Sequence, residues 1–460
     1  MTLLNRWFIW ESGTRNMCFG CLSCLLNRPH GHIYIDRSTH SLQQLSAQGN
    51  AQSHRPHFKS IGKIKFDRNY ILGSGDEGNV YRGTFENEAT AAIKQICKVK
   101  SNKNDAIRKR VRKANQTLLQ DSCENIVKYY CFEAKGSTLY ICMELCQCNV
   151  THFIRTSPDS LPDNSLQQVL RGIEFLHDLR LLHRDIKPSN VLVTTNRSGE
   201  VILKLSDFSI SKEMSQLCGV ESGMYVGTPN WMAPEINNQK SSTSTNTNAA
   251  TPIMFETPAD IFSLGLVCFN IATRGGKLFT TQRAIDSNSV SQCHIHQLDN
   301  QPLNKDLVQR MTEFNASNRP TATVCLKHPC HWSVEKALDF FERASDRLKN
   351  DAVMTSAIER QANHVFSQPW NTNLTPHVDS ELFTWARGKP SYDPTKLKSL
   401  LRAVRNIKHH IQDMPGLHSE IGTSQRSVLD YWTGRFPMLL LTVHHVFRQL
   451  AHLDDFKRFY

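Results

Sequence analysis

The stretch that decides the fold is Gly73-Ser74-Gly75-Asp76-Glu77-Gly78-Asn79-Val80. Short β-type runs surround it at residues 70–72, 79–85 and 90–95, and tight connections between such runs predict an antiparallel sheet. Glycine lets a backbone approach phosphate oxygens without a side chain in the way, so that its amides face the negative charge. A glycine-rich hairpin alone is often only a turn. The motifs that follow this one make it a stronger indication of a phosphate-binding site.

Those motifs stand downstream in a fixed order. Residues 91–94 read Ala-Ala-Ile-Lys and place a cation on the third predicted strand, and residues 183–190 read His-Arg-Asp-Ile-Lys-Pro-Ser-Asn. Ser-Asp-Phe follows at 206–208 and Ala-Pro-Glu at 233–235. The ordered set resembles the eukaryotic protein kinases over residues 66–332.

The resemblance implies a bilobal α+β kinase fold that binds ATP or ADP together with Mg²⁺. Lys94 would hold the α- and β-phosphates, while Asn190 and Asp207 would bind Mg²⁺. Asp185 would accept the proton of the substrate hydroxyl, with Lys187 beside the transferred phosphoryl group. The remaining nucleotide-binding positions are those of the glycine-rich hairpin and of the hinge, where the backbone faces adenine: Leu72, Gly73, Ser74, Gly75, Gly78, Val80, Glu144 and Cys146.

The sequence departs from the kinase pattern at two points. Residues 96–120 contain no glutamate that could pair with Lys94, and the segment that follows Asp207 begins Phe208-Ser209 where glycine is usual. Nucleotide binding is therefore expected, and an inactive, nucleotide-binding scaffold stays open as the alternative to phosphotransfer. Several hydroxyls of the activation segment are candidates for phosphorylation: Ser211, Ser215, Ser222, Tyr225 and Thr228.

After residue 329 the composition shifts to long amphipathic patterns. A helix is predicted over residues 395–412, with an apolar stripe formed by Leu397, Leu400, Leu401, Val404 and Ile411. Its polar residues recur at every fourth position and share one face: Lys398, Arg402, Asn406 and His410, with Arg405 adjacent. Pattern alone describes an ordinary amphipathic helix.

The full string is more specific. Residues 400–410 read Leu-Leu-Arg-Ala-Val-Arg-Asn-Ile-Lys-His-His, and Arg-Phe-Pro follows at 435–437. This resembles the all-α kinase-extension nuclease domain of the inositol-requiring kinase/endoribonuclease of the unfolded protein response, and more distantly the oligoadenylate-dependent ribonuclease. One position that tends to be lysine in that family reads Ile407, which is expected to alter the grip on substrate.

The resemblance implies four residues of a ribonuclease site. Tyr392 and His410 would transfer protons, Arg405 would stabilise charge on phosphorus and Asn406 would orient the site. Because RNA is cut by its own 2′-hydroxyl, such groups suffice without a metal.

The expected organisation is a weakly structured segment at 1–65, a kinase domain at 66–332 and a helical nuclease domain at 333–460. The expected function is a serine/threonine kinase and endoribonuclease that cleaves stem-loop RNA and is activated by nucleotide-dependent homodimerisation. Two alternatives remain: a pseudokinase scaffold with a non-catalytic extension, and an ordinary kinase with a structural tail.

Charge and composition agree with this. The 460 residues carry 54 Lys and Arg against 42 Asp and Glu, a net charge of +12 that suits an anionic partner such as RNA, although a solvated basic face is commoner. The basic residues 98–113 could contact RNA or simply be solvated. Residues 237–257 are rich in Ser, Thr and Asn and read as a surface loop.

The remaining features concern location. Fourteen cysteines are too few for a disulfide scaffold, and no stretch approaches the ~18 apolar residues that a membrane helix needs, so a cytoplasmic protein is expected. Cys18, Cys21 and Cys24 lie near His30 and His32, where zinc binding, fatty acylation or no role are all open.

Overall fold

The computed structural model describes residues 58–75, 78–96, 122–136, 138–207, 227–237, 256–386 and 391–460. They belong to one unit of the chain, which spans residues 35–460. The cysteine-rich run near residue 20 and the basic residues 98–113 lie outside this described part, as does nearly all of the Ser/Thr/Asn-rich tract. No helix in the described ranges is long and apolar enough to cross a membrane.

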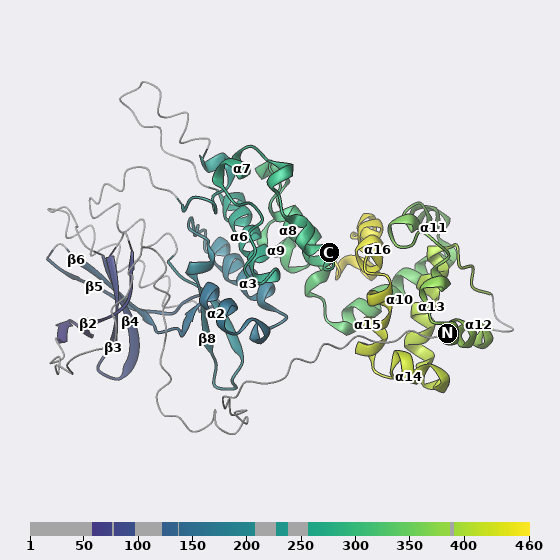
Figure 1. Cartoon of the computed structure of the whole chain (residues 1–460), viewed down its shortest axis with the longest axis horizontal. Coiled ribbons are helices and arrows are strands. Elements are labelled where there is room, and N and C mark those ends of the chain that lie inside the picture. The colour runs from purple at the N-terminus through teal and green to yellow at the C-terminus, as the bar shows by residue number, and fades with distance from the viewer. Residues whose placement is uncertain are drawn as a thin grey trace, which may run out of the picture. The chain divides into compact units, whose positions relative to one another are not determined.

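The N-terminal lobe is one antiparallel sheet in the order β1-β2-β3-β4-β6-β5, with β2 to β6 side by side in Figure 1. Its strands are β1 (Phe58–Ile61), β2 (Ile64–Gly75), β3 (Gly78–Phe85), β4 (Ala89–Ile96), β5 (Tyr129–Lys135) and β6 (Thr138–Glu144). The antiparallel pairing is as the sequence predicts. However, β1 and the start of β2 fall inside the segment that was expected to be weakly structured, because Ile61 and Ile64 are buried under the sheet.

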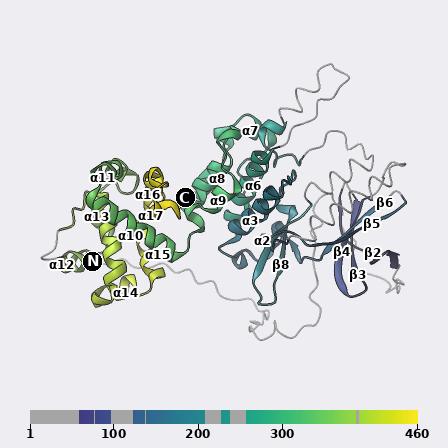
Figure 2. The same cartoon turned by 180° about the vertical axis from the view of Figure 1, so that it is seen from behind.

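The second lobe is mainly helical and carries a small sheet in the order β7-β8-β9. Its strands are β7 (Cys148–Asn149), β8 (Val191–Thr195) and β9 (Val201–Leu205). Its helices are α2 (Val150–Thr156), α3 (Ser165–Asp178), α6 (Thr257–Ala272), α7 (Gln282–Asp286), α8 (Pro302–Met311) and α9 (Ala322–Leu326). Figure 2 shows α3, α6, α8 and α9 gathered together from behind. Helix α6 is buried almost all round, which makes it the centre of this lobe.

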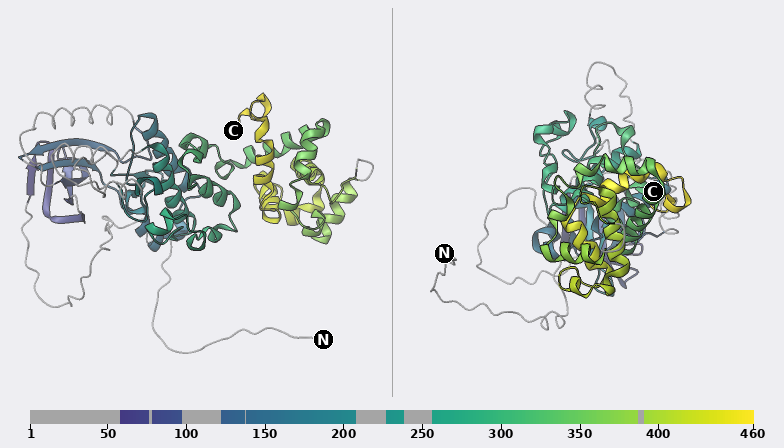
Figure 3. Two further views of the ribbon diagram at one scale, coloured as in Figure 1. Left: turned by 90° about the horizontal axis from the view of Figure 1, so that it is seen from above. Right: turned by 90° about the vertical axis from the view of Figure 1, so that its right-hand side faces the viewer.

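The C-terminal region is helical throughout its described residues, as two further views in Figure 3 also show. Its helices are α10 (Val334–Asn350), α11 (Ala352–Glu359), α12 (Pro376–Trp385), α13 (Leu397–His410), α14 (His418–Ile421), α15 (Gln425–Arg435), α16 (Leu439–Phe447) and α17 (Asp454–Lys457). Their apolar faces form a hydrophobic core of their own, separate from the core of the kinase lobes.

Helix α13 packs its apolar stripe into that core. Leu397, Leu400, Leu401, Val404 and Ile407 are all buried, at spacings of three and four residues. The residue at its N-cap, Lys396, makes no side-chain capping bond. Instead Glu359, the last residue of α11, accepts hydrogen bonds from the backbone N–H groups of Leu397 (3.0 Å) and Lys398 (2.9 Å). A carboxylate also complements the positive end of the helix dipole.

Removing this cap should weaken the C-terminal domain. We expect Glu359→Ala to lower the free energy of unfolding by about 2 kcal/mol, because two helix N–H groups lose a charged acceptor. Urea denaturation of the full chain measures the change. Asp430→Asn, which alters only an exposed ion pair with Arg426, should cost less than about 0.5 kcal/mol and serves as the control. Equal effects for the two variants would contradict the capping role.

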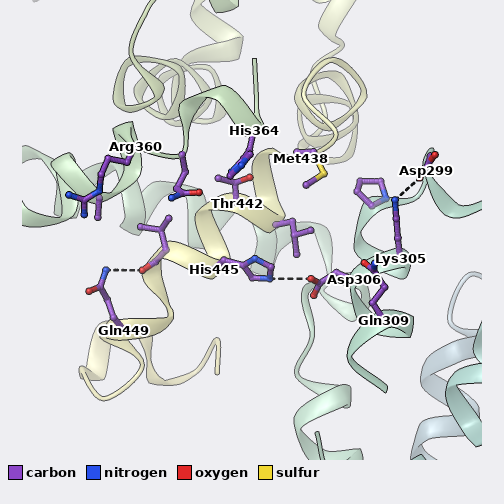
Figure 4. A pocket seen from close by; sticks show the side chains of 15 residues that line it. Asp299, Lys305, Asp306, Gln309, Arg360, His364, Met438, Thr442, His445 and Gln449 are labelled. Carbon is purple, nitrogen blue, oxygen red and sulfur yellow. Dashed lines mark hydrogen bonds and ion pairs between the residues drawn. The ribbon is translucent and has the colours of Figure 1, made fainter. Parts of the chain in front are cut away.

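A polar cluster joins α8 of the kinase to α16 of the C-terminal region. The carboxylate of Asp306 lies 2.6 Å from Nε of Arg310, 3.0 Å from His328 and 3.5 Å from His445. Figure 4 shows His445 directed at Asp306, and both residues line the adjoining 730 Å³ cavity. Next to the cluster, the ring of His444 stacks on Tyr460 with centroids 4.6 Å apart. The junction is therefore a polar network around Asp306 backed by aromatic packing.

The histidines of this junction should make the fold sensitive to acid. Burial lowers the pKa of His444 to about 2, and the neighbouring His328, His445 and Arg310 act in the same direction while Asp306 opposes them. Burial also lowers the pKa of His331 to about 4. The folded state holds these two histidines neutral. Below about pH 6.5 the unfolded state therefore binds more protons, and the stability of the fold decreases as the pH decreases.

We expect His444→Phe to make this loss of stability between pH 6.5 and 4.5 shallower, since one proton-binding group is removed and the stacking on Tyr460 is retained. Urea unfolding at a series of pH values measures the slope. His452→Phe, at an exposed position, should leave the slope unchanged. If His444→Phe and wild type have the same slope, the junction is not the source of the acid sensitivity.

Candidate active sites

The glycine-rich hairpin has the geometry of a phosphate cradle. Strands β2 and β3 pair up to Gly75 and Gly78 at the tip of the hairpin. Gly78 has φ of +139°, and a Cβ there would stand 1.9 Å from the carbonyl oxygen of Gln95, so a side chain is excluded. Leu72 and Ala92 belong to the hydrophobic core that lies next to the hairpin, and Val80 is half-buried against that core.

Lys94, on β4, reaches the loop after β9. Its ammonium nitrogen lies 2.9 Å from Oδ1 of Asp207, and the lysine is only 7% exposed. Asp207 has φ of +59°, which turns its carboxylate out of the direction of the strand. The predicted phosphate ligand and one predicted Mg²⁺ ligand are thus adjacent. The segment 96–120, which contains no glutamate to pair with Lys94, lies almost wholly outside the described residues, as does the serine at 209.

The side chains of the two hinge positions are hydrogen-bonded or buried. The carboxylate of Glu144 is taken up by Lys204 (3.0 Å) and by the N–H of Lys128 (2.6 Å). Cys146 is buried, and burial raises the pKa of its thiol to about 12, so the thiol is unreactive. Contact with an adenine through the main chain, as the sequence predicts, is compatible with both side chains.

Four side chains converge at the catalytic loop. Lys187 lies 3.0 Å from Oδ2 of Asp185, and Nδ2 of Asn190 donates to the backbone carbonyl (2.8 Å) and Oδ2 (3.2 Å) of Asp185. The hydroxyl of Thr228 donates to Oδ1 of Asp185 (2.6 Å) and accepts from Lys187 (2.7 Å). Because Thr228 is engaged in this way, it is a poor candidate for phosphorylation, and the other candidate hydroxyls lie outside the described residues.

The loop is held from beneath by Asp260 of α6. This fully buried carboxylate accepts the backbone N–H groups of His183 (2.8 Å) and Arg184 (2.9 Å) and lies 3.1 Å from Nε2 of His177. Arg184 has φ of +65°, an unfavourable backbone conformation that the paired hydrogen bonds stabilise. Asp260 therefore fixes the position of Asp185.

Asn190 and Asp207 fit a magnesium site in their chemistry. Asn190 uses its amide nitrogen on Asp185, which leaves its carbonyl oxygen as a ligand, and Asp207 contributes carboxylate oxygens. Oxygen atoms of this kind are what Mg²⁺ prefers, usually together with phosphate oxygens of a nucleotide.

A second constellation lies on the polar face of α13. Nδ2 of Asn406 donates to the phenol oxygen of Tyr392 at 2.8 Å, and the guanidinium of Arg405 lies 3.4 Å from the amide oxygen of Asn406. Asp346 of α10 lies 2.8 Å from Nε of Arg405. Three of the four predicted nuclease residues are therefore linked in one chain of contacts.

Tyr392 is 4% exposed and is held from several sides. Trp370 and Phe383 meet its ring edge to face, and the guanidinium of Arg402 lies 4.5 Å from the ring centroid. Burial raises the pKa of Tyr392, while the Asn406 hydrogen bond and Arg402 oppose that rise. The phenol consequently stays protonated at neutral pH, and its O–H remains available to a substrate.

His410 lies one turn beyond Asn406, on the same helix. Its Nδ1 is 3.1 Å from Oδ2 of Asp413, its side chain is 43% exposed, and the ring of Trp385 lies 5.1 Å away. Within the described ranges His410 makes no hydrogen bond or ion pair with Tyr392, Arg405 or Asn406, so a substrate would have to bridge the gap. Ile407 is fully buried on the leucine stripe and does not face this surface.

Sequence reasoning missed several residues around this site. Trp385, Asp346, Asp413 and Arg402 each touch a predicted nuclease residue, but Trp385 and Asp346 do so from other helices. Only Arg402 carried a signal, since it belongs to the i, i+4 series of the helix.

Two protein families match this chain. The protein kinase domain family matches residues 66–331, which is more than half of the chain, and the chain belongs to that family. The Ribonuclease 2-5A family matches residues 337–460.

The chain is similar to bifunctional enzymes. It is 30% identical over 419 residues to the serine/threonine-protein kinase/endoribonuclease ire-1 of Caenorhabditis elegans, covering 86% of this chain and 41% of that protein. It is 32% identical over 423 residues to the serine/threonine-protein kinase/endoribonuclease IRE2 of Homo sapiens, covering 87% of this chain and 43% of that protein. It is 29% identical over 468 residues to the protein of Schizosaccharomyces pombe that is named sensor for unfolded proteins in the ER ire1, covering 92% of this chain and 42% of that protein. The chain thus spans about two fifths of the length of these relatives.

Proposed function

We propose that this chain is a serine/threonine protein kinase and a metal-independent RNA endonuclease that cleaves stem-loop RNA in a response to unfolded proteins. The observation that carries the nuclease part is the linked set of Tyr392, Asn406 and Arg405 beside His410. The convergence of Lys187, Asn190 and Thr228 on Asp185 supports the kinase part. The separate hydrophobic cores on either side of residue 332 support a domain boundary there.

In the kinase step, Asp185 orients the substrate hydroxyl and accepts its proton, and Lys187 stabilises the charge of the transferred phosphoryl group. Lys94 holds nucleotide phosphates, and Asn190 and Asp207 would hold Mg²⁺, which neutralises charge on the phosphates when bound. The glycine-rich hairpin at Gly73, Ser74, Gly75 and Gly78 covers those phosphates. Phosphoryl transfer depends mainly on positioning and charge neutralisation, and these groups supply both.

In the nuclease step, the 2′-oxygen of RNA attacks the adjacent phosphorus and the bond from phosphorus to the 5′-oxygen breaks. One proton leaves the 2′-hydroxyl and another is given to the departing 5′-oxygen, and we assign these two transfers to Tyr392 and His410. Tyr392 enters the reaction protonated, because burial raises its pKa. Arg405 stabilises negative charge on the phosphorus oxygens, and Asn406 holds the phenol in place.

Incubation of a hairpin RNA with the protein in a chelator such as EDTA tests the nuclease. We expect cleavage that leaves a 2′,3′-cyclic phosphate, and we expect His410→Ala to slow it about 100- to 10,000-fold, the usual contribution of a proton-transfer group. His452→Ala, an exposed histidine of the same domain, should cleave like wild type. Cleavage of an RNA with a 2′-deoxy scissile residue would contradict the mechanism.

Labelled ATP tests the kinase separately. We expect wild type to transfer label to itself or to a protein substrate, and Asp185→Asn to lower the rate at least about 100-fold. Asp159→Asn, on the exposed 3₁₀ turn Pro158–Ser160, should retain wild-type transfer. Binding of ATP with no transfer by wild type would instead identify a nucleotide-binding scaffold.

Dimerisation driven by nucleotide and a cytoplasmic setting complete the proposal. The kinase/endoribonuclease resemblance is the basis for the homodimer. The cysteines of the described residues are all free, which suits a reducing compartment. RNA and ATP are the partners that the two sites would meet there.

A further inference from the structure

A cavity of 350 Å³ opens beside the first turn of α13, between α10 and α11. Four cationic side chains line it: Lys349 from α10, and Lys396, Lys398 and Arg402 from the start of α13. Glu359 is the single carboxylate in the lining. Helix formation explains why two of these residues lie together, since Lys398 and Arg402 are four positions apart on one face.

Cationic side chains outnumber carboxylates in the lining of this cavity. Both oxygens of Glu359 accept backbone N–H groups of α13, and Asp393 acts on the charge of Lys396. In the ranges that the structure describes, the ammonium group of Lys398 forms no ion pair with a carboxylate. The larger cavity of Figure 4 differs, because Asp299 pairs with Lys305 in it and Asp306 pairs with His445. Binding of an anion is therefore favoured in the cavity beside α13 and disfavoured in the cavity of Figure 4.

Two contacts connect the cavity directly to the nuclease centre. Arg402 lines the cavity and also lies against the Tyr392 ring, where its guanidinium donates to the carbonyl of Ser391 at 2.7 Å. Asp346 lies 2.6 Å from Lys349 of the cavity and 2.8 Å from Arg405 of the centre. The cavity and the nuclease centre are thus linked through Arg402 and Asp346.

The spacing suits a strand of nucleic acid. Lys398 precedes His410 by twelve residues, or about 18 Å along the helix at ~1.5 Å per residue. Side chains at every fourth position along that length turn by about 40° per step and form a stripe that winds slowly around the helix. A single strand of a few nucleotides would extend over this distance with its phosphates toward the helix.

We propose that this cavity is a binding subsite for backbone phosphates of the RNA strand next to the scissile bond, with Lys396 and Lys398 as the principal contacts and Lys349 at its edge. The inference rests on the proposed ribonuclease function. It assigns the two lysines to substrate binding and not to the chemical step. Removing them should raise KM and leave kcat unchanged.

The test uses the full chain with Lys396→Ala and Lys398→Ala combined, and a hairpin RNA as probe. We expect KM to rise about tenfold at moderate salt, since each lost phosphate contact costs roughly threefold. Binding of the same hairpin with a 2′-deoxy scissile residue should show a salt slope reduced by about 1.4, or ~0.7 per lysine. The thermal midpoint of the variant, measured in parallel, should equal that of wild type.

The matched control combines Arg426→Ala and Lys457→Ala, which removes two exposed cations of the same domain from α15 and α17. It should leave KM and the salt slope near wild type. A normal KM and slope in the Lys396/Lys398 variant would overturn the subsite, as would equal losses in the two double variants. If wild type fails to cleave the hairpin at all, the ribonuclease proposal itself fails, so the two failures are distinguishable.

Discussion

The start of α13 depends on a carboxylate that belongs to another helix. Its own N-cap residue is a lysine, so the first N–H groups of the helix would lack an acceptor without Glu359. This bond fixes α11 to α13 and sets where the helix begins. From that point the 3.6-residue period decides the rest: leucines face the core, while Arg402, Asn406 and His410 face outward. The position of Asn406 against Tyr392 follows from it.

The kinase lobes use the same physical device. Asp260 accepts two consecutive backbone N–H groups of the catalytic loop, as Glu359 does at α13. In both places a carboxylate from a distant element replaces hydrogen bonds that the local backbone cannot make. A charged acceptor for two amides is strong, and it positions the residues that follow, Asp185 in one site and the polar face of α13 in the other. In each site the carboxylate holds the backbone in place.

The local motifs could be predicted from the sequence because each is short and its chemistry depends on neighbouring residues. Lys94 and Asp207 do come together, and the amphipathic period placed α13 within a few residues of its true ends. Contacts made by packing could not be predicted in this way. Nothing near Glu359 indicates that it caps a helix beginning 38 residues later, and no period brings Trp385 to His410 or Asp346 to Arg405. Strand β1 was missed because its four residues carry too little pattern to stand out.

The proposed nuclease function requires RNA to lie along the polar face of α13. A crystal structure of the chain with a hairpin RNA that carries a 2′-deoxy residue at the scissile position tests this most directly. We expect the scissile phosphate to lie within hydrogen-bonding distance of Arg405, with Tyr392 and His410 on opposite sides of the phosphorus. An RNA bound elsewhere, for example on the basic residues 98–113, with the face of α13 unoccupied, would contradict it.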